Sequence, residues 1–367
     1  MSHSMHATYD RPTVLLLGIQ APYNKTKDID SYWKEFIKLA EANELEYDHT
    51  LFTKLREIDS SYFLTKGKLE ELREFCEKHA IDHVIVSEPL TAMQERNIQN
   101  IINAKVFDRT RLILEIFEKA AHSAEGKKQV EIAMLQHKKT RLAGRGIHLS
   151  QQAGGIGTRG PGETAKEKDI RHIEEGILKL KRQLLKIEKS RQTQRKKRIE
   201  SSYPLFCLIG YTNAGKSTIL NALTKSTVHA QDKLFATLDT TTRELYINNE
   251  KKGLISDTVG FIQQLPHQLI DAFKSTLSEL HFADLLIHVI DLSDSNWELH
   301  IKVVHEILDD LDVDKPMVYV FNKSDQIPEK QIFEDRIAQY QPQVVISATS
   351  KKGIKPLIDF LANWSAK

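Results

Sequence analysis

The chain is poor in cysteine, in long apolar stretches and in excess charge of either sign. Its 367 residues include only two cysteines, Cys76 and Cys207, which excludes a disulfide framework. No apolar run reaches the roughly 20 residues that a membrane-spanning helix needs. Residues 1–10 are polar and lack the apolar core of a signal peptide. These absences predict a cytoplasmic protein without stable membrane insertion.

The overall composition is that of a globular protein. Hydrophobic residues make up 40% of the chain and charged residues 28%, which is ordinary for a folded domain. The formal net charge is only +2, so any affinity for nucleic acid must come from local basic patches. A length of 367 residues predicts two or three domains.

A phosphate-binding loop is the strongest motif in the sequence. It fits the pattern G-x-x-x-x-G-K-[ST], between an apolar run at 205–209 and a stretch with helical spacing at 218–224. Strand, glycine loop and helix in this order direct backbone N–H groups at phosphate oxygens. Lys216 adds a positive charge for the outer phosphates, and Ser217 offers a hydroxyl to Mg²⁺. The loop consists of Gly210, Tyr211, Thr212, Asn213, Ala214, Gly215, Lys216 and Ser217.

Two further loops follow in the order of a guanine-nucleotide switch. The first is rich in threonine and contains Phe235, Ala236, Thr237, Leu238, Asp239 and Thr240. One of its threonines is expected to bind Mg²⁺, although the spacing does not select which one. The second loop contains Asp257, Thr258, Val259 and Gly260. Asp257 is expected near Mg²⁺, and the Gly260 amide is expected near the γ-phosphate.

Phe261 occupies the position where many such switches have a glutamine that orients the attacking water. A phenyl ring cannot orient water, so the sequence predicts slow intrinsic hydrolysis, on the order of 10⁻⁴ s⁻¹, and acceleration by a partner.

Two loops near the C-terminus predict guanine recognition. The first contains Asn322, Lys323, Ser324 and Asp325 and follows an apolar run at 317–321. The Asp325 carboxylate can accept two hydrogen bonds from guanine, and adenine lacks that pair of donors, which predicts discrimination of about 10⁴-fold. Lys323 can cover the base, and Asn322 can brace the loops. The second loop contains Ser347, Ala348 and Thr349, and the Ala348 amide is expected to meet the guanine carbonyl.

The first 107 residues alternate strand and helix patterns, which predicts a parallel α/β domain. The expected strands are at 13–18, 47–52 and 82–86, and the expected helices are at 31–42, 67–79 and 91–103. Residues 108–141 predict helical structure, with an irregularity near Gly126. A second helix is predicted by a coiled-coil seam and is expected to fold back antiparallel on the first. The seam contains Ile170, Ile173, Ile177, Leu180, Leu184 and Ile187.

A segment dense in glycine, residues 144–163, separates the two predicted helices. Arg141, Arg145 and Arg159 lie in or beside it. Its composition fits a flexible linker and an RNA-contacting loop equally well. The helix after it carries a basic run from Lys179 to Arg198, which is usually a solvated face but here favours a polyanionic partner.

Several of these stretches resemble the HflX family of ribosome-associated GTPases. Residues 154–163 resemble the family signature, and the stretches at 107–110, 125–127, 210–217 and 235–239 are similar as well. The resemblance implies an α/β domain at 1–107, a long antiparallel helical hairpin at 108–200 and a doubly wound P-loop GTPase domain at 201–367. It also implies that Thr237 is the threonine that binds Mg²⁺. Thr240 departs from the family, which usually has proline there.

The resemblance also implies a function. The chain is expected to bind GTP and GDP with Mg²⁺, to hydrolyse GTP slowly alone and faster on the ribosome, and to be monomeric away from it. It is expected to bind the large ribosomal subunit through ribosomal RNA and to split stalled or idle ribosomes under stress. The alternatives are a large-subunit assembly or storage factor with nucleotide-gated RNA binding, and a regulator of a membrane protease or another protein. The expected catalytic residues are Lys216, Thr237 and Gly260, and the expected metal ligands are Ser217 and Thr237.

Overall fold

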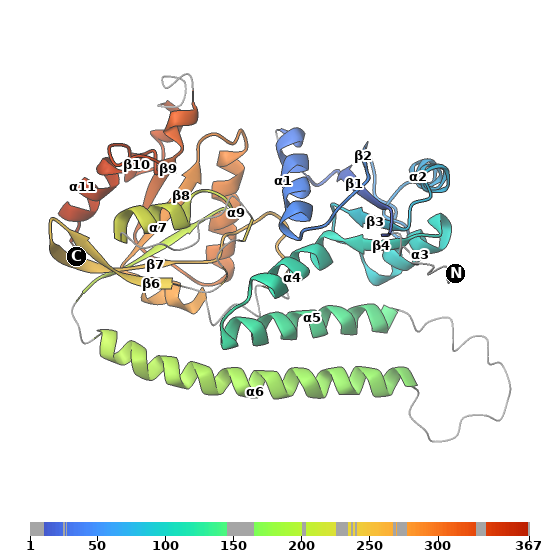
Figure 1. The fold of residues 1–367 in the computed structure, drawn as a ribbon, viewed down its shortest axis with the longest axis horizontal. Helices are drawn as coiled ribbons and strands as arrows, with labels where there is room; N and C mark the ends of the chain where they lie inside the picture. Colours follow the sequence, from blue (N-terminus) through green and yellow to red (C-terminus); the bar gives the residue numbers. More distant parts are fainter. Residues whose placement is uncertain are drawn as a thin grey trace, which may run out of the picture. The chain divides into compact units, whose positions relative to one another are not determined.

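The chain forms two compact units that are interleaved along the sequence. The computed structural model describes residues 11–24, 26, 28–144, 165–199, 203–224, 234–235, 238, 241–266, 269, 277–327 and 335–365, with backbone alone at 144, 165 and 188–199 (Figure 1). One unit comprises Met1–Lys25, Glu44–Leu112 and Thr140–Thr158, and the other comprises Thr26–Asn43, Ile113–Lys139 and Arg159–Lys367. Helices and parallel sheets occur together, so the predicted α/β class is confirmed.

The first unit is built on a parallel four-stranded sheet in the order β2-β1-β3-β4. The strands are β1 (Val14–Gln20), β2 (His49–Lys54), β3 (His83–Val86) and β4 (Lys105–Asp108), and the helices are α2 (Lys66–His79) and α3 (Ala92–Ile102). Leu72 and Ile98 from the helices share a buried core with Leu15 and Leu17 of β1. The strand β4 has no counterpart in the sequence prediction.

The start of α3 follows from a capping box. Thr91 accepts a hydrogen bond from the Gln94 N–H (3.2 Å), and the Gln94 side chain accepts one from the Thr91 N–H (2.9 Å). This reciprocal pair satisfies two N–H groups that a helix start leaves open. Thr91, at which the predicted helix 91–103 begins, is therefore the N-cap of α3.

Helix α1 (Ile29–Ala42) belongs to the second unit, although the sequence predicts it within the first domain. Its buried face contains Tyr32, Phe36, Leu39 and Ala40. The Asn296 amide nitrogen donates to the Asp28 carbonyl oxygen (3.0 Å) just before the helix. The Ser31 hydroxyl lies 3.0 and 3.2 Å from the two carboxylate oxygens of Asp294. The helix is thus held by residues that precede α9 (Trp297–Asp310).

Three helices lie between the two sheets in sequence, namely α4 (Arg109–Ala120), α5 (Ala124–Gly144) and α6 (Ala165–Ile199). The helical structure is interrupted at residues 121–123 and not at Gly126. The Ser123 hydroxyl accepts a hydrogen bond from the Gly126 N–H (2.9 Å) and so caps the start of α5.

Helix α6 lies antiparallel beside α5 (Figure 1). Lys139 pairs with Glu174 (2.6 Å), and a Cβ built on Gly176 would lie 3.5 Å from Leu135. Ile173 and Leu180 are buried, as the predicted seam requires.

The second unit contains a six-stranded sheet in the order β10-β9-β8-β5-β7-β6, with β6 antiparallel to β7 and the remaining pairs parallel. The strands are β5 (Leu205–Gly210), β6 (Thr241–Ile247), β7 (Glu250–Asp257), β8 (Leu285–Asp291), β9 (Met317–Asn322) and β10 (Gln343–Val345). Helices α7 (Lys216–Thr224) and α11 (Lys355–Asn363) share one core with the sheet, and α9 shares another. A doubly wound sheet of this kind presents its ligand site at the carboxyl ends of its strands.

None of the helices in the described part of the chain is both long enough and apolar enough to span a bilayer.

A buried histidine in this sheet makes the stability of the fold dependent on pH. His288 in β8 is 1% exposed, and burial, with smaller contributions from His305 and Lys216, lowers its pKa to about 3. Its pKa in the unfolded chain is about 6.5, so the unfolded state binds the extra proton as the pH falls below that value. We expect this residue alone to cost about 2 kcal/mol of stability at about pH 5 relative to about pH 7. Urea unfolding at both pH values should show a smaller pH dependence in His288→Gln than in the wild type, and equal dependence would contradict the assignment.

Candidate nucleotide-binding site

The loop after β5 has a backbone that only glycine can follow at two positions. Gly210 has φ +143° and Gly215 has φ +97°. A Cβ at Gly210 would lie 2.2 Å from the Val289 carbonyl oxygen, and one at Gly215 would lie 2.3 Å from the Asn322 amide nitrogen. These contacts leave no room for a side chain, so the loop is pressed against β8 and β9. Strand, loop and helix follow in the predicted order.

Lys216 is a buried cation at the start of α7. Its side chain is enclosed, and Nζ donates to the carbonyl oxygens of Gly210 (3.1 Å) and Tyr211 (2.7 Å). Burial lowers the pKa of this ammonium to about 8, and the nearby Asp257 carboxylate opposes that shift. A phosphate group brought to the loop would add negative charge beside this ammonium and so favour its charged form.

Ser217, an expected Mg²⁺ ligand, and Asp257, expected near the ion, lie next to this lysine. The Ser217 hydroxyl donates to a carboxylate oxygen of Asp257 (2.6 Å), and Asp257 is fully buried. A hydroxyl and a carboxylate are hard oxygen donors of the kind that Mg²⁺ prefers when it also binds phosphates. The residues present therefore fit a Mg²⁺–nucleotide complex, in which the ion would neutralise charge on the phosphates.

Gly260 lies against the same lysine. A Cβ built on it would lie 2.9 Å from Lys216 Nζ and 2.9 Å from Thr212 Cγ2. The chain after Gly260 continues as a backbone bridge to the phosphate loop, because the Phe261 N–H donates to Gly210 (3.1 Å) and the Thr212 N–H donates to Phe261 (2.7 Å). The Phe261 side chain itself is buried.

Asn322 joins three loops of the site. Its amide nitrogen donates to the Ala214 carbonyl oxygen (2.9 Å), and its amide oxygen accepts the Ala348 N–H (3.0 Å). The bracing role predicted for Asn322 is therefore seen directly. The sequence predicts the Ala348 N–H for the guanine carbonyl, whereas this N–H donates to Asn322.

The residues that follow Asn322 expose the carboxylate of Asp325. Lys323 has φ +62° and pairs with Asp291 (2.6 Å), and the short 3₁₀ helix η2 (Ser324–Gln326) follows. Asp325 in η2 is exposed. The chain thus turns so that the Asp325 carboxylate is open to a ligand.

Other residues predicted at the site have structural contacts. The Thr258 hydroxyl donates to the Leu208 carbonyl oxygen (2.7 Å), and Val259 is buried. The hydroxyls of Ser347 and Thr349 bond each other (2.9 Å).

In the threonine-rich loop, Phe235 is buried with its ring centroid 4.5 Å from that of Phe117 in α4, and Leu238 is buried as well. The side chains of Phe235 and Leu238 therefore serve packing. Ala236, Thr237 and Asp239 lie outside the described residues.

Arg141, predicted to contact RNA, is held within the first unit. Its guanidinium pairs with Asp108 (2.8 Å) and Glu95 (3.1 Å) and donates to the Leu90 carbonyl oxygen (2.7 Å). We therefore do not include Arg141 among the residues proposed to bind RNA. Arg145 and Arg159 lie outside the described residues.

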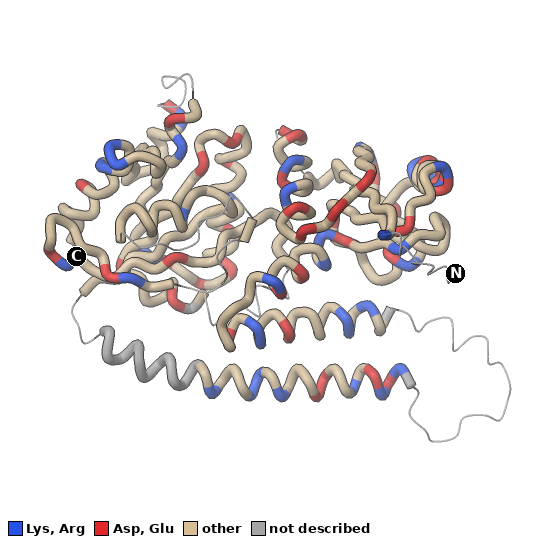
Figure 2. Tube along the Cα trace, viewed as in Figure 1, with Lys and Arg blue, Asp and Glu red and all other residues tan. Residues whose placement is uncertain are grey.

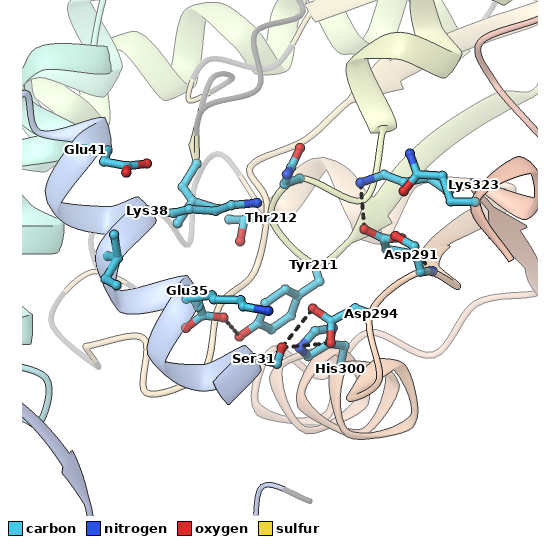
Figure 3. Close-up of a pocket in the computed structure, with 16 residues that line it drawn as sticks. Ser31, Glu35, Lys38, Glu41, Tyr211, Thr212, Asp291, Asp294, His300 and Lys323 are labelled. Carbon is cyan, nitrogen blue, oxygen red and sulfur yellow. Dashed lines mark hydrogen bonds and ion pairs between the residues drawn. The ribbon is translucent and has the colours of Figure 1, made fainter. Parts of the chain in front are cut away.

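Helix α1 forms one wall of a cavity beside the phosphate loop, which the sequence does not predict. A cavity of about 540 Å³ lies between the start of the phosphate loop and α1 (Figure 3). Tyr211, Thr212 and Lys323 line one side, and Glu35 and Lys38 line the other. This volume is in the range of small-molecule sites.

A doubly wound sheet with a glycine loop, a buried lysine and an exposed aspartate after an Asn-Lys pair defines a P-loop GTPase. Three family descriptions match consecutive parts of the chain: "GTP-binding GTPase N-terminal" at 30–118, "GTP-binding GTPase Middle Region" at 120–198 and "50S ribosome-binding GTPase" at 205–323. The chain belongs to the HflX family of GTPases, and it hydrolyses GTP.

Relatives match along most of their length. GTPase HflX of Caldanaerobacter subterraneus is 44% identical over 326 residues, which cover 89% of this chain and 75% of the relative. GTPase HflX of Escherichia coli is 38% identical over 341 residues, which cover 92% and 80%. Among solved structures, SsGBP in complex with GDP is 26% identical with a TM-score of 0.50, and the match covers 95% of this chain and 97% of that one.

Proposed function

We propose that this GTPase binds the large ribosomal subunit through ribosomal RNA and splits stalled or idle ribosomes under stress. The match to the family described as a 50S ribosome-binding GTPase supports the partner. The observation on this chain that carries the proposal is the basic face of α6. Lys179, Lys181, Arg182 and Lys186 are all exposed, whereas Ile173 and Leu180 are buried. Lysine and arginine positions recur along α6 (blue in Figure 2). A row of exposed cations on a long helix suits a phosphate backbone.

The nucleotide is proposed to control this binding. Mg²⁺ would be held by Ser217 and Thr237, with Asp257 beside it, and Lys216 and Gly260 would contact the outer phosphate. The remaining residues of the predicted loops, 210–217, 235–239, 257–260, 322–325 and 347–349, would surround the nucleotide. A loop ordered by a phosphate relaxes when that phosphate leaves, so hydrolysis would drive release from the ribosome.

Hydrolysis by the free protein is proposed to be slow, on the order of 10⁻⁴ s⁻¹, because the buried Phe261 offers no group to orient water. Ribosome binding would accelerate it. We also propose that the protein acts in the cytoplasm, in line with a ribosome as partner, and that it is a monomer when unbound.

Sedimentation of assembled ribosomes tests the function. With GTP or a non-hydrolysable analogue we expect the protein to increase the fraction of free subunits, and with GDP we expect no increase. No extra free subunits with either triphosphate would overturn the splitting role. Accumulation on immature large subunits, without action on assembled ribosomes, would identify an assembly or storage factor instead.

Charge reversal tests the RNA contact. In Arg145→Glu and Arg159→Glu we expect ribosome affinity to fall and the slope of log affinity on log salt to shrink by about one for each arginine. Lys355→Glu, which reverses an exposed charge on α11, is the matched control and should bind like the wild type. Equal affinity of all variants would exclude the two arginines from the contact.

A further inference from the structure

We propose that Tyr211 is a positioning residue for GTP hydrolysis, and that helix α1 holds it in place through Glu35. The proposal concerns the GTPase reaction itself and does not depend on what the protein does to ribosomes. The groups concerned are the Glu35 carboxylate and the Tyr211 hydroxyl, which are hydrogen-bonded to each other. Both act on the backbone that follows Gly260.

The Tyr211 side chain connects the phosphate loop with the segment after Gly260. Its hydroxyl accepts the Gln263 backbone N–H (2.9 Å) and donates its own proton to the Glu35 carboxylate (Figure 3). Its ring stacks on His300 with centroids 3.7 Å apart and planes 9° apart. The side chain is 5% exposed, so this one hydroxyl group is both satisfied and shielded from water.

The segment from Gly260 to Gln263 is fastened to the phosphate loop at three atoms. The Phe261 N–H and carbonyl oxygen make backbone bonds to Gly210 and Thr212, and the Gln263 N–H makes the third bond. The first two bonds join backbone atoms and do not depend on the side chains at these positions. The third needs a side-chain hydroxyl at position 211. Gly260 lies so close to Lys216 that a Cβ would be 2.9 Å from Nζ, and small shifts of this segment would therefore change its distance from the phosphate site.

Helix α1 contacts Tyr211 and the segment after Gly260 through two side chains that lie one turn apart. Glu35 holds the Tyr211 hydroxyl, and the Tyr32 hydroxyl donates to the Gln264 side chain (3.3 Å). Residues at spacing i, i+3 lie on the same helix face. The helix stays attached elsewhere, because Ser31 bonds Asp294 and Asn296 bonds Asp28. Loss of the Glu35 contact alone should therefore not release α1.

Single-turnover and steady-state GTP hydrolysis test the proposal. In Tyr211→Phe the ring and its stacking remain while the hydroxyl is lost, and we expect kcat to fall about fivefold to tenfold with KM and GDP affinity changed less than about twofold. Glu35→Ala should give the same loss. The double variant should be no slower than either single variant, since both remove one linked interaction. Glu35→Gln retains an acceptor for the phenol proton and should recover most of the wild-type kcat.

The matched control is Tyr246→Phe. Tyr246 is 52% exposed in β6, and its hydroxyl donates to Glu244 (2.9 Å), so this variant removes the same kind of bond away from the site. It should hydrolyse GTP like the wild type. Hydrogen exchange should show faster deuterium uptake at 261–264 in Tyr211→Phe and in Glu35→Ala, but not in Tyr246→Phe. Wild-type kcat in Tyr211→Phe, or additive losses in the double variant, would overturn the proposal.

Discussion

Replacement of Asp325 by asparagine is expected to shift the preference between GTP and XTP by about 10⁴-fold toward XTP. The Asp325 carboxylate is exposed in η2, and two acceptor oxygens match the N1–H and the 2-amino group of guanine. An asparagine amide offers one acceptor and one donor. With guanine, the asparagine N–H would face the 2-amino group, which is also a donor. With xanthine, the 2-oxo group can accept a hydrogen bond from that N–H.

Competition of GTP, XTP and ATP against a fluorescent guanine nucleotide measures this shift. The matched control is Asp314→Asn, which removes the same charge from another exposed position of the same unit and should leave all affinities unchanged. Because Asp325 is exposed, its variant should also melt at the wild-type temperature. Undiminished GTP affinity in Asp325→Asn, or ATP bound as tightly as GTP by the wild type, would contradict guanine recognition at this residue.

The core of the nucleotide site was predictable because each of its motifs is local. The loop from Gly210 to Ser217 is defined by glycines whose φ angles no other residue adopts easily and by a lysine at fixed spacing. Asn322 likewise follows its strand directly, and the bonds it makes to Ala214 and Ala348 follow from two strand ends meeting at one sheet edge.

The sequence could not predict which sheet α1 packs on. An amphipathic pattern identifies the buried face of a helix but not the element that covers that face. The pattern of Tyr32, Phe36 and Leu39 fits a helix packed on either sheet. What decides the matter is contacts such as Ser31 with Asp294, whose partners are more than 200 residues apart in sequence. No local signal carries that information.

Charge patterns likewise do not reveal the intramolecular partners of Arg141. An arginine beside a glycine-rich stretch indicates a nucleic-acid contact, but its acceptors Asp108 and Glu95 come from distant parts of the chain. The contact of Phe235 with Phe117 also depends on tertiary structure and has no local signal. The break between α4 and α5 had a readable signal in Ser123, a good N-cap three residues before Gly126.

Replacement of Lys216 by alanine is expected to reduce kcat/KM for GTP by about 10²-fold to 10³-fold. The ammonium is buried and held by two loop carbonyl oxygens, so no other described side chain can replace it without rearranging the loop. The variant should also lose most of the rise in Tm that GTP gives the wild type, because that rise follows nucleotide affinity. Steady-state hydrolysis and thermal unfolding with and without GTP measure both effects.

The control for this variant must separate loss of the charge from damage to the fold. Lys302→Ala removes a lysine from an exposed position of α9 in the same unit and should hydrolyse GTP at the wild-type rate. The nucleotide-free Lys216→Ala protein should melt no lower than the wild type, because burial of a charge costs free energy and lowers the pKa of this lysine to about 8. A stable variant that binds GTP poorly would assign the loss to the missing charge. A variant that hydrolyses GTP within about tenfold of the wild type would show that the buried ammonium does not face the outer phosphate.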